Sequence, residues 1–148
     1  MANRGPEKVF RLLVIEDDTG RVEMLRNWLP ERIKLVVAPS AGAAIGILKR
    51  DRGNVYGGIM LDHDLQQRAM TSMDKALSGT DVTQAIINTV SSDVPVLIHS
   101  MNSAGSSDMA AILQKAGFEV TLIPIDKLDR EILTEWMEEA YGLWEDTL

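Results

Sequence analysis

The chain has 148 residues, of which 45% are hydrophobic and 25% are charged, and this size and composition fit one packed domain. Because the sequence contains no cysteine, disulfides, thiolate metal sites and cysteine nucleophiles are excluded, and carboxylates, histidines and hydroxyls must carry any chemistry. The formal net charge is −7, and an acidic balance argues against a protein that binds the groove of duplex DNA.

The acidic surplus is concentrated in residues 126–148, which hold eight acidic side chains and two basic ones. Residues 1–9 are polar and charged, without the apolar run of a signal peptide. No uncharged stretch approaches the ~20 apolar residues that span a membrane. We therefore expect a cytoplasmic protein that does not enter the membrane, with one domain over residues 1–148 and a flexible segment at residues 1–9.

Five short apolar runs alternate with helical patterns along the chain. The runs cover residues 11–15, 33–37, 56–61, 95–98 and 120–123. Most of them place β-branched residues at consecutive rather than alternating positions, which is typical of strands buried on both faces of a parallel sheet. The sequence therefore predicts an α/β fold built on a five-stranded parallel sheet.

The helical spacing of apolar residues predicts a helix after each run. The predicted helices cover residues 19–29, a segment starting after Ser40, and residues 81–90, 107–116 and 129–142, with an extension through Leu143 and Trp144 left open. Ser40 and Thr80 are the expected N-terminal caps, and Gly117 is the expected left-handed stop. Five strand–helix units with right-handed crossovers give a doubly wound sheet with helices on both faces.

The connection at residues 65–78 is longer than an ordinary loop between a strand and a helix, which takes ~2 to 6 residues. Its polar side chains suit a lid over a functional site. The alternative is a short extra helix at about residues 70–77, and both interpretations stay open.

Polar side chains follow three of the predicted strands. The groups are Glu16-Asp17-Asp18, Asp62-His63-Asp64 and His99-Ser100-Met101-Asn102. In an open α/β sheet, ligands bind outside the carboxyl ends of the strands, so these side chains are the candidates for a site. Two acidic clusters at one edge form the kind of oxygen-rich site that Mg²⁺ prefers. The alternative for the first group is that its acids only cap the following helix, where negative charge is stabilised.

Three motifs carry a family resemblance over nearly the whole chain. LLVIEDD, IMLD and VPVLIHS resemble the receiver domain of bacterial response regulators. The resemblance implies a flavodoxin-like sheet with strand order 2-1-3-4-5 and a Mg²⁺ ion held by the acidic pair Glu16 and Asp17. It also implies that Asp62 is the phosphoacceptor and that Ser100 contacts the phosphoryl group.

Two departures separate this sequence from ordinary receivers. Receiver domains usually carry a lysine directly before a proline after the fifth strand, whereas this chain has Ile123 before Pro124, and its nearest lysine is Lys127. The fifth strand also lacks the aromatic residue of many receivers. The segments LDHDL and HSMN instead resemble a receiver-like variant associated with cyclic-phosphate processing, in particular of 2',3'-cyclic phosphate ends in RNA repair.

Three functional hypotheses follow. The first is an enzyme, a metal-dependent phosphohydrolase or cyclic phosphodiesterase acting on a phosphate-bearing small molecule or an RNA end. The second is a signalling receiver, in which a histidine kinase or phosphotransfer protein phosphorylates Asp62. The third is a degenerate receiver that serves as a docking module.

The enzyme hypothesis assigns a role to each polar side chain. Glu16, Asp17 and Asp62 hold Mg²⁺ or Mn²⁺, His63 and His99 act as acid and base, and Ser100 and Asn102 orient the phosphate. Two imidazoles suit this task because one can accept a proton while the other donates one near neutral pH. Strand alternation raises a difficulty, because His99 should point away from the site if Ser100 points into it, unless the strand ends at Ile98. For His99 the alternative is a buried structural histidine.

Overall fold

The computed structural model describes residues 8–65 and 78–148. Its strands are β1 (Phe10–Ile15), β2 (Ile33–Ala38), β3 (Gly58–Leu61), β4 (Val96–Ile98) and β5 (Val120–Leu122). All neighbouring pairs are parallel, and the strand order is β2-β1-β3-β4-β5. The predicted flavodoxin-like sheet and its strand order are confirmed.

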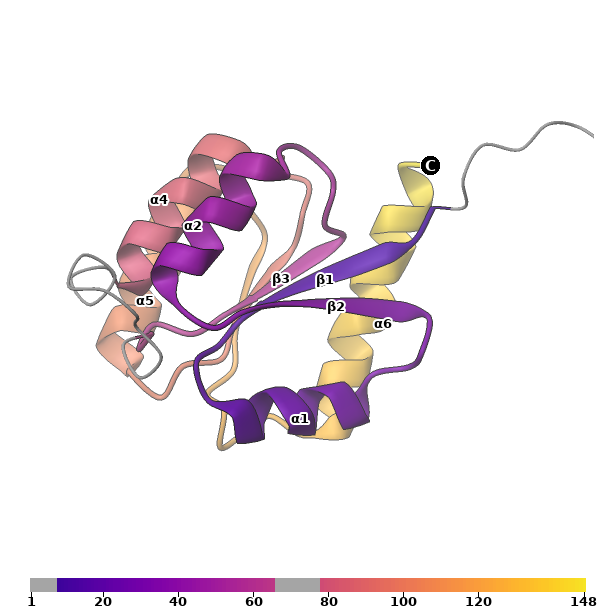
Figure 1. The fold of residues 1–148 in the computed structure, drawn as a ribbon, viewed down its shortest axis with the longest axis horizontal. Helices are drawn as coiled ribbons and strands as arrows, with labels where there is room; N and C mark the ends of the chain where they lie inside the picture. The colour runs from indigo at the N-terminus through magenta and orange to yellow at the C-terminus, as the bar shows by residue number, and fades with distance from the viewer. Residues whose placement is uncertain (1–7, 66–77) are drawn as a thin grey trace, which may run out of the picture.

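Helices cover both faces of this sheet. They are α1 (Thr19–Trp28), α2 (Ala41–Arg50), α4 (Gly79–Thr89), α5 (Ser103–Lys115) and α6 (Arg130–Asp146). Figure 1 shows α2, α4 and α5 together on one face, with α1 and α6 on the other. The extension of the last helix through Leu143 and Trp144 is confirmed.

The alternation of side chains along the strands divides the interior into two cores. Leu13 and Ile59 belong to the core beneath α2, α4 and α5, whereas Leu12 and Met60 belong to the core beneath α1 and α6. All four side chains are fully buried. Because burying one such side chain contributes roughly 1.5 to 3 kcal/mol, the two cores fix which face each strand residue occupies.

Two helices begin earlier than their sequence patterns predict. The N-terminal cap of α4 is Ser78, whose hydroxyl accepts a hydrogen bond from the Thr80 backbone and which forms a capping box with Asp81. The cap expected at Thr80 is therefore wrong. The start expected at residue 107 for α5 is also wrong, because the Asn102 side chain caps a helix that begins at Ser103.

The other two expected helix signals are confirmed. The Ser40 hydroxyl accepts a hydrogen bond from the Ala43 backbone and caps α2. Gly117 follows α5 with a φ of +96°, a conformation that glycine adopts without a steric penalty. The lid or extra helix expected at residues 65–78 falls largely outside the described residues, as does most of the segment at residues 1–9.

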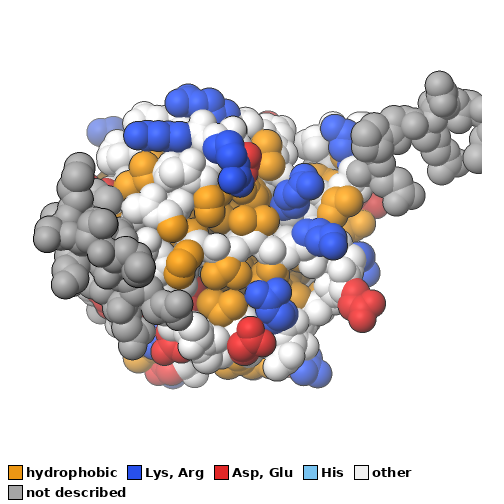
Figure 2. Space-filling view, in the orientation of Figure 1, with side chains coloured by type: hydrophobic (Ala, Val, Ile, Leu, Met, Phe, Trp, Pro, Cys, Tyr) orange, Lys and Arg blue, Asp and Glu red, His pale blue; other side chains and the backbone are white. Residues whose placement is uncertain are grey.

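Strand β2 forms one edge of the sheet, and its Leu35, Val36 and Val37 are half-buried. Figure 2 shows hydrophobic side chains gathered in the middle of the face where Figure 1 places β2, with mostly Lys and Arg around them. The exposed Lys34 lies on the strand itself, and charge on an edge strand opposes pairing with other chains. Among the described helices, none is both long and apolar enough to cross a membrane.

Candidate functional site

Three polar residues form a row across the carboxyl edge of the sheet. Glu16, Asp62 and His99 each directly follow the last residue of β1, β3 and β4. The last register pairs are Ile15 with Leu61 and Leu61 with Ile98, so the three polar residues lie side by side. They continue the strand alternation of Val14, Met60 and Leu97, which places all three on the face covered by α1 and α6.

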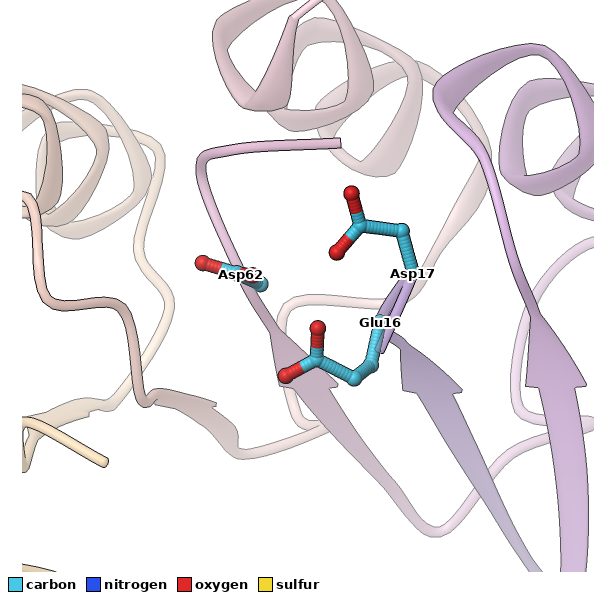
Figure 3. Close-up of side chains that lie close together, drawn as sticks. All are labelled: Glu16, Asp17 and Asp62. Carbon is cyan, nitrogen blue, oxygen red and sulfur yellow. The ribbon is translucent and has the colours of Figure 1, made fainter. Parts of the chain in front are cut away.

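Three carboxylates gather at this edge. One oxygen from each of Glu16, Asp17 and Asp62 lies within 4.8 Å of the others, and all three residues are buried. Figure 3 shows Glu16 and Asp17 at the end of β1 and Asp62 at the end of β3. Asp18 instead caps α1 by accepting a hydrogen bond from the Arg21 backbone at 3.0 Å. The capping alternative therefore applies to Asp18, while its two neighbours join the cluster.

The pKa values of Glu16 and Asp62 are shifted in opposite directions. Burial, followed by the charge of Glu16, raises the pKa of Asp62 to about 6. Burial also acts to raise the pKa of Glu16, but the hydrogen bond and electrostatic attraction of His99 outweigh it and lower that pKa to about 2. Close carboxylates cannot all ionise without an added positive charge, so the cluster has the donor chemistry of a hard-cation site.

Arg21 supplies a positive charge that the sequence analysis missed. Its Nη1 atom lies 3.6 Å from Oε1 of Glu16 and 3.6 Å from Oδ2 of Asp62. The guanidinium reaches both acids because Arg21 stands in the first turn of α1, directly after β1. Its side chain is half-buried, with 34% exposed, so it can contact the acids and a ligand from solvent. The available signal was its position three residues after the Asp18 cap.

His99 is sealed inside the protein. Its side chain has no exposed surface, and its Nε2 atom lies 3.1 Å from Oε1 of Glu16, which is equally buried. No hydrogen-bond partner for its Nδ1 atom lies among the described residues. The difficulty raised by strand alternation is resolved because β4 ends at Ile98 and His99 stays on the face of Glu16. This position favours a role through Glu16 over the expected direct acid or base role.

His63 directly follows Asp62, and its side chain lies beside the starts of α4 and α5 with 20% of its surface exposed. Its Nδ1 atom lies 3.1 Å from Oδ1 of Asp64 and 3.3 Å from Nδ2 of Asn102. The amide of Asn102 is oriented by its cap, because Oδ1 accepts a hydrogen bond from the Gly105 backbone at 2.8 Å. Its NH₂ group therefore faces the imidazole and can donate only to an unprotonated Nδ1, whereas Asp64 accepts from a protonated one. The Nδ1 atom of His63 therefore has a partner whether or not it carries a hydrogen.

Two glycines make room for the His63 ring and backbone. A Cβ atom at Gly105 would lie 2.6 Å from Cδ2 of the imidazole, and a Cβ atom at Gly79 would lie 2.7 Å from the His63 Cα atom. Both distances are shorter than side-chain packing allows. His63 is therefore held against the first turns of α4 and α5, a constraint that the sequence analysis did not detect.

The residues expected to orient a phosphate have structural partners of their own. The Ser100 hydroxyl accepts a hydrogen bond from the Asn102 backbone at 3.1 Å, and it also hydrogen-bonds Asp62 and acts to lower its pKa. Asn102 uses its oxygen to cap α5 and its NH₂ group to contact His63. Ser100 is therefore next to the carboxylates, and Asn102 acts on the orientation of His63.

Comparison with known proteins places this arrangement in a family. A family model described as the cyclic-phosphate processing receiver domain matches residues 12–115. No curated protein matches the chain.

Solved structures of receiver domains have the same fold. A CheY-like receiver from Methanospirillum hungatei is 15% identical with a TM-score of 0.67, covering 93% of this chain and 98% of its own. The receiver domain of a putative LuxO repressor from Vibrio parahaemolyticus is 20% identical with a TM-score of 0.67, covering 94% and 95%. The receiver domain of a sensor histidine kinase from Pseudomonas aeruginosa is 19% identical with a TM-score of 0.62, covering 90% of this chain and 98% of its own. That structure holds a magnesium ion in its active-site cleft.

Proposed function

Because the chain belongs to the family of cyclic-phosphate processing receiver domains, we propose that it hydrolyses a cyclic phosphate ester at the carboxyl edge of its sheet. The observation that carries this proposal is the arrangement of His63. A partly exposed imidazole, whose Nδ1 atom has a partner with or without a hydrogen, directly follows Asp62 of the buried carboxylate cluster.

Glu16, Asp17 and Asp62 are the residues that would hold Mg²⁺ or Mn²⁺. The donor set fits, because it consists of buried oxygens within 4.8 Å and because mutual repulsion disfavours the ionised cluster alone. When bound, such an ion supplies positive charge that stabilises the charge developing on phosphate oxygens. We propose no thiol or imidazole ligand.

Arg21 and Ser100 are the groups that we propose bind the phosphate. A guanidinium donates charge-assisted hydrogen bonds to phosphate oxygens, and Arg21 already stands over Glu16 and Asp62 with a third of its side chain in solvent. The Ser100 hydroxyl hydrogen-bonds Asp62, and its single hydrogen would turn to a phosphate oxygen when a phosphate binds. These two side chains would orient the phosphorus atom toward His63.

His63 is the proposed proton carrier. It takes a proton from the attacking water as the new phosphorus–oxygen bond forms, and it returns that proton to the ester oxygen as the ring opens. The products balance, because one water and one cyclic diester give one phosphate monoester with a free hydroxyl. Asn102 and Gly105 serve this step by fixing the plane of the imidazole.

His99 is proposed as a positioning residue. It holds the Glu16 carboxylate in the ionised form and in one orientation through the 3.1 Å contact. Because the His99 side chain is fully buried, it acts on the substrate only through Glu16.

A parallel assay in Mg²⁺ tests this function against the phosphoacceptor alternative. The protein is offered uridine and adenosine 2',3'-cyclic phosphates in one arm and acetyl phosphate in the other. Turnover of a cyclic ester that Asp62→Asn and His63→Ala abolish supports the proposal. Formation of an acid-labile phosphoprotein that depends on Asp62, without turnover of a cyclic ester, supports phosphorylation by a histidine kinase or phosphotransfer protein instead. If neither turnover nor phosphorylation is observed, the docking module is supported.

A further inference from the structure

Strand β2 leaves one edge of the sheet unpaired. It is the last strand on its side of the sheet, and Figure 1 shows it between α2 and α1. The Ala38 carbonyl accepts a hydrogen bond from the Glu16 backbone at 3.1 Å, so the main-chain groups of Ala38 face β1. Because peptide groups point alternately to the two sides along a strand, those of Leu35 and Val37 point away from the sheet. The edge can therefore pair with another extended chain.

The middle of this edge is apolar. Leu35, Val36 and Val37 are only half-buried, although Leu35 and Val36 each pack against one of the two cores. Figure 2 shows hydrophobic side chains across the middle of this face. Covering half-exposed aliphatic side chains is favourable, so a second strand laid along β2 would gain free energy from this surface as well as from main-chain hydrogen bonds.

Basic side chains surround the apolar middle (Figure 2). Residues 33–52, which contain β2 and α2, hold one acidic side chain and four basic ones, in a chain whose net charge is −7: Lys34, Lys49, Arg50 and Arg52. The single acid, Asp51, is already paired with Arg50 at 2.8 Å and with the Tyr56 hydroxyl. This part of an acidic protein therefore presents a positively charged surface.

Two of the cations on this surface are neighbours in the sheet. Arg11 of β1 and Lys34 of β2 are register partners, and both are exposed. Adjacent strands lie ~4.8 Å apart, so two like charges stand close together. Neither forms an ion pair with an acid in the described part of the chain, and Arg11 acts on Asp51 only at longer range. Their repulsion is a cost in the free protein that acidic side chains of a partner would relieve.

We propose that the edge of β2 binds an extended acidic segment of a partner protein as an additional strand. The main chain of the partner would pair with Leu35 and Val37, and its apolar side chains would cover the middle of the edge. Its acidic side chains would lie beside Arg11 and Lys34. The inference goes beyond the proposed function and does not depend on it, because these cations stand at the amino ends of their strands, whereas the carboxylate cluster lies at the carboxyl edge.

Charge and surface chemistry disfavour two other occupants. A second copy that paired through its own β2 would bring two positively charged surfaces together, and like charges on neighbouring strands are destabilising. A single-stranded nucleic acid would meet the cations, but its bases stack on aromatic rings, and the middle of this edge is built from Leu35, Val36 and Val37. A peptide strand matches both the aliphatic side chains and the unpaired main-chain groups.

Binding is measured by titrating the isotope-labelled protein and following its backbone amide resonances. The test ligand is a synthetic peptide of about ten residues in which alternating valines and threonines are flanked by glutamates. Three matched ligands are the same peptide with lysines in place of the glutamates, the same peptide with N-methylated central residues, and an oligouridine of similar length. We expect saturable shifts at β2 with the glutamate peptide, and binding about tenfold weaker or less for the lysine and N-methylated peptides.

Lys34→Glu tests the charge of the edge. It places an acid opposite Arg11, so the melting temperature should not fall, while binding of the glutamate peptide should weaken about tenfold. An exposed ion pair contributes up to about fivefold, and charge reversal adds a repulsion of similar size. Lys34→Arg should bind like the wild type. Lys115→Glu is the control with the same change in net charge, because Lys115 is exposed at the end of α5, which packs against the opposite edge strand β5.

The possible outcomes decide between the occupants. Absence of saturable binding at about 1 mM peptide, shifts that avoid β2, equal binding of the glutamate and lysine peptides, or undiminished binding to Lys34→Glu overturns the inference. Tighter binding of the oligouridine overturns it in favour of nucleic acid, and concentration-dependent self-association that Lys34→Glu alters overturns it in favour of a second copy. Asp62→Asn should leave peptide binding unchanged, so each proposal can fail without the other.

Discussion

The Nε2 atom of His99 lies 3.1 Å from Oε1 of Glu16, and neither side chain is exposed to solvent. Glu16 is itself one of three clustered carboxylates, and its neighbour Asp62 has a raised pKa. The histidine therefore offsets part of the negative charge within the core. Removing it leaves a buried carboxylate without its main partner, which costs free energy beyond the lost contact.

For His99→Ala we therefore expect a loss of stability of ~1 to 3 kcal/mol, the range for a buried polar partner that is removed. The measurement is the free energy of unfolding from denaturant titration. His99→Gln, which keeps a buried hydrogen-bond donor, should recover part of the loss. A wild-type stability in His99→Ala would show that the pair contributes nothing to the fold.

For His63→Ala the expected pattern is the reverse. The side chain is partly exposed and its Nδ1 contacts are with Asp64 and Asn102, so the melting temperature should change little. Turnover of a cyclic phosphate should fall by the ~10² to 10⁴ typical of a lost proton-transfer group. Rate and melting temperature are measured on the same preparations, and a destabilised His63→Ala with an unchanged rate would assign the imidazole to the fold.

Gly105→Ala should disturb the site without touching a charged group. The added methyl would lie 2.6 Å from the His63 ring, so the ring must move away from Asn102, and turnover should fall. Gly46→Ala is the matched control, because it also lies within a helix and a Cβ there meets nothing within 4 Å. The control should keep full activity and gain roughly 0.5 to 1 kcal/mol of stability. Equal activities in the two variants would show that Gly105 does not position His63.

The stabilisation by Mg²⁺ should depend on pH through Asp62. Its pKa is about 6 in the folded protein against an ordinary value of 3.8, so its contribution to stability is complete below about pH 3.8 and is lost as pH rises through about 6. A cation relieves the repulsion that causes this loss. Mg²⁺ should therefore raise the melting temperature strongly above about pH 6 and weakly at pH 5.

Asp62→Asn provides the control for this titration. The variant should be more stable than the wild type in metal-free buffer above pH 6, and it should respond less to Mg²⁺ at every pH. A shift with Mg²⁺ that has the same size at pH 5 and pH 8, or that survives in Asp62→Asn, would contradict the assigned cluster.

Arg21→Ala should weaken phosphate binding. Loss of a charge-assisted contact is expected to raise the KM for a cyclic nucleotide by about tenfold, with a smaller effect on the melting temperature because the side chain is partly exposed. Arg26→Ala is the matched control, since Arg26 lies on the same helix and forms an exposed pair with Glu23. An unchanged KM for Arg21→Ala would show that the phosphate is held elsewhere.

The sequence predicted the parts of the site that follow directly from strand ends. Glu16, Asp17 and Asp62 each stand next to a recognisable apolar run, and parallel strands bring their carboxyl ends to one edge. Arg21 and Gly105 were not predicted, because their contacts depend on how α1 and α5 fold back over that edge. The start of α4 was predicted two residues too late, because Ser78 and Thr80 are both acceptable caps and only the capping box with Asp81 decides between them.

The row formed by Glu16, Asp62 and His99 also has a consequence for the order of folding. Glu16 and His99 are separated by 83 positions along the chain, and the row exists only when β1, β3 and β4 are paired in register. We expect contacts of such high sequence separation to form late, because ordering the intervening chain costs entropy before the contact is made. A cation held by Glu16, Asp17 and Asp62 would therefore stabilise the native state more than the folding transition state, and we expect it to slow unfolding without accelerating folding.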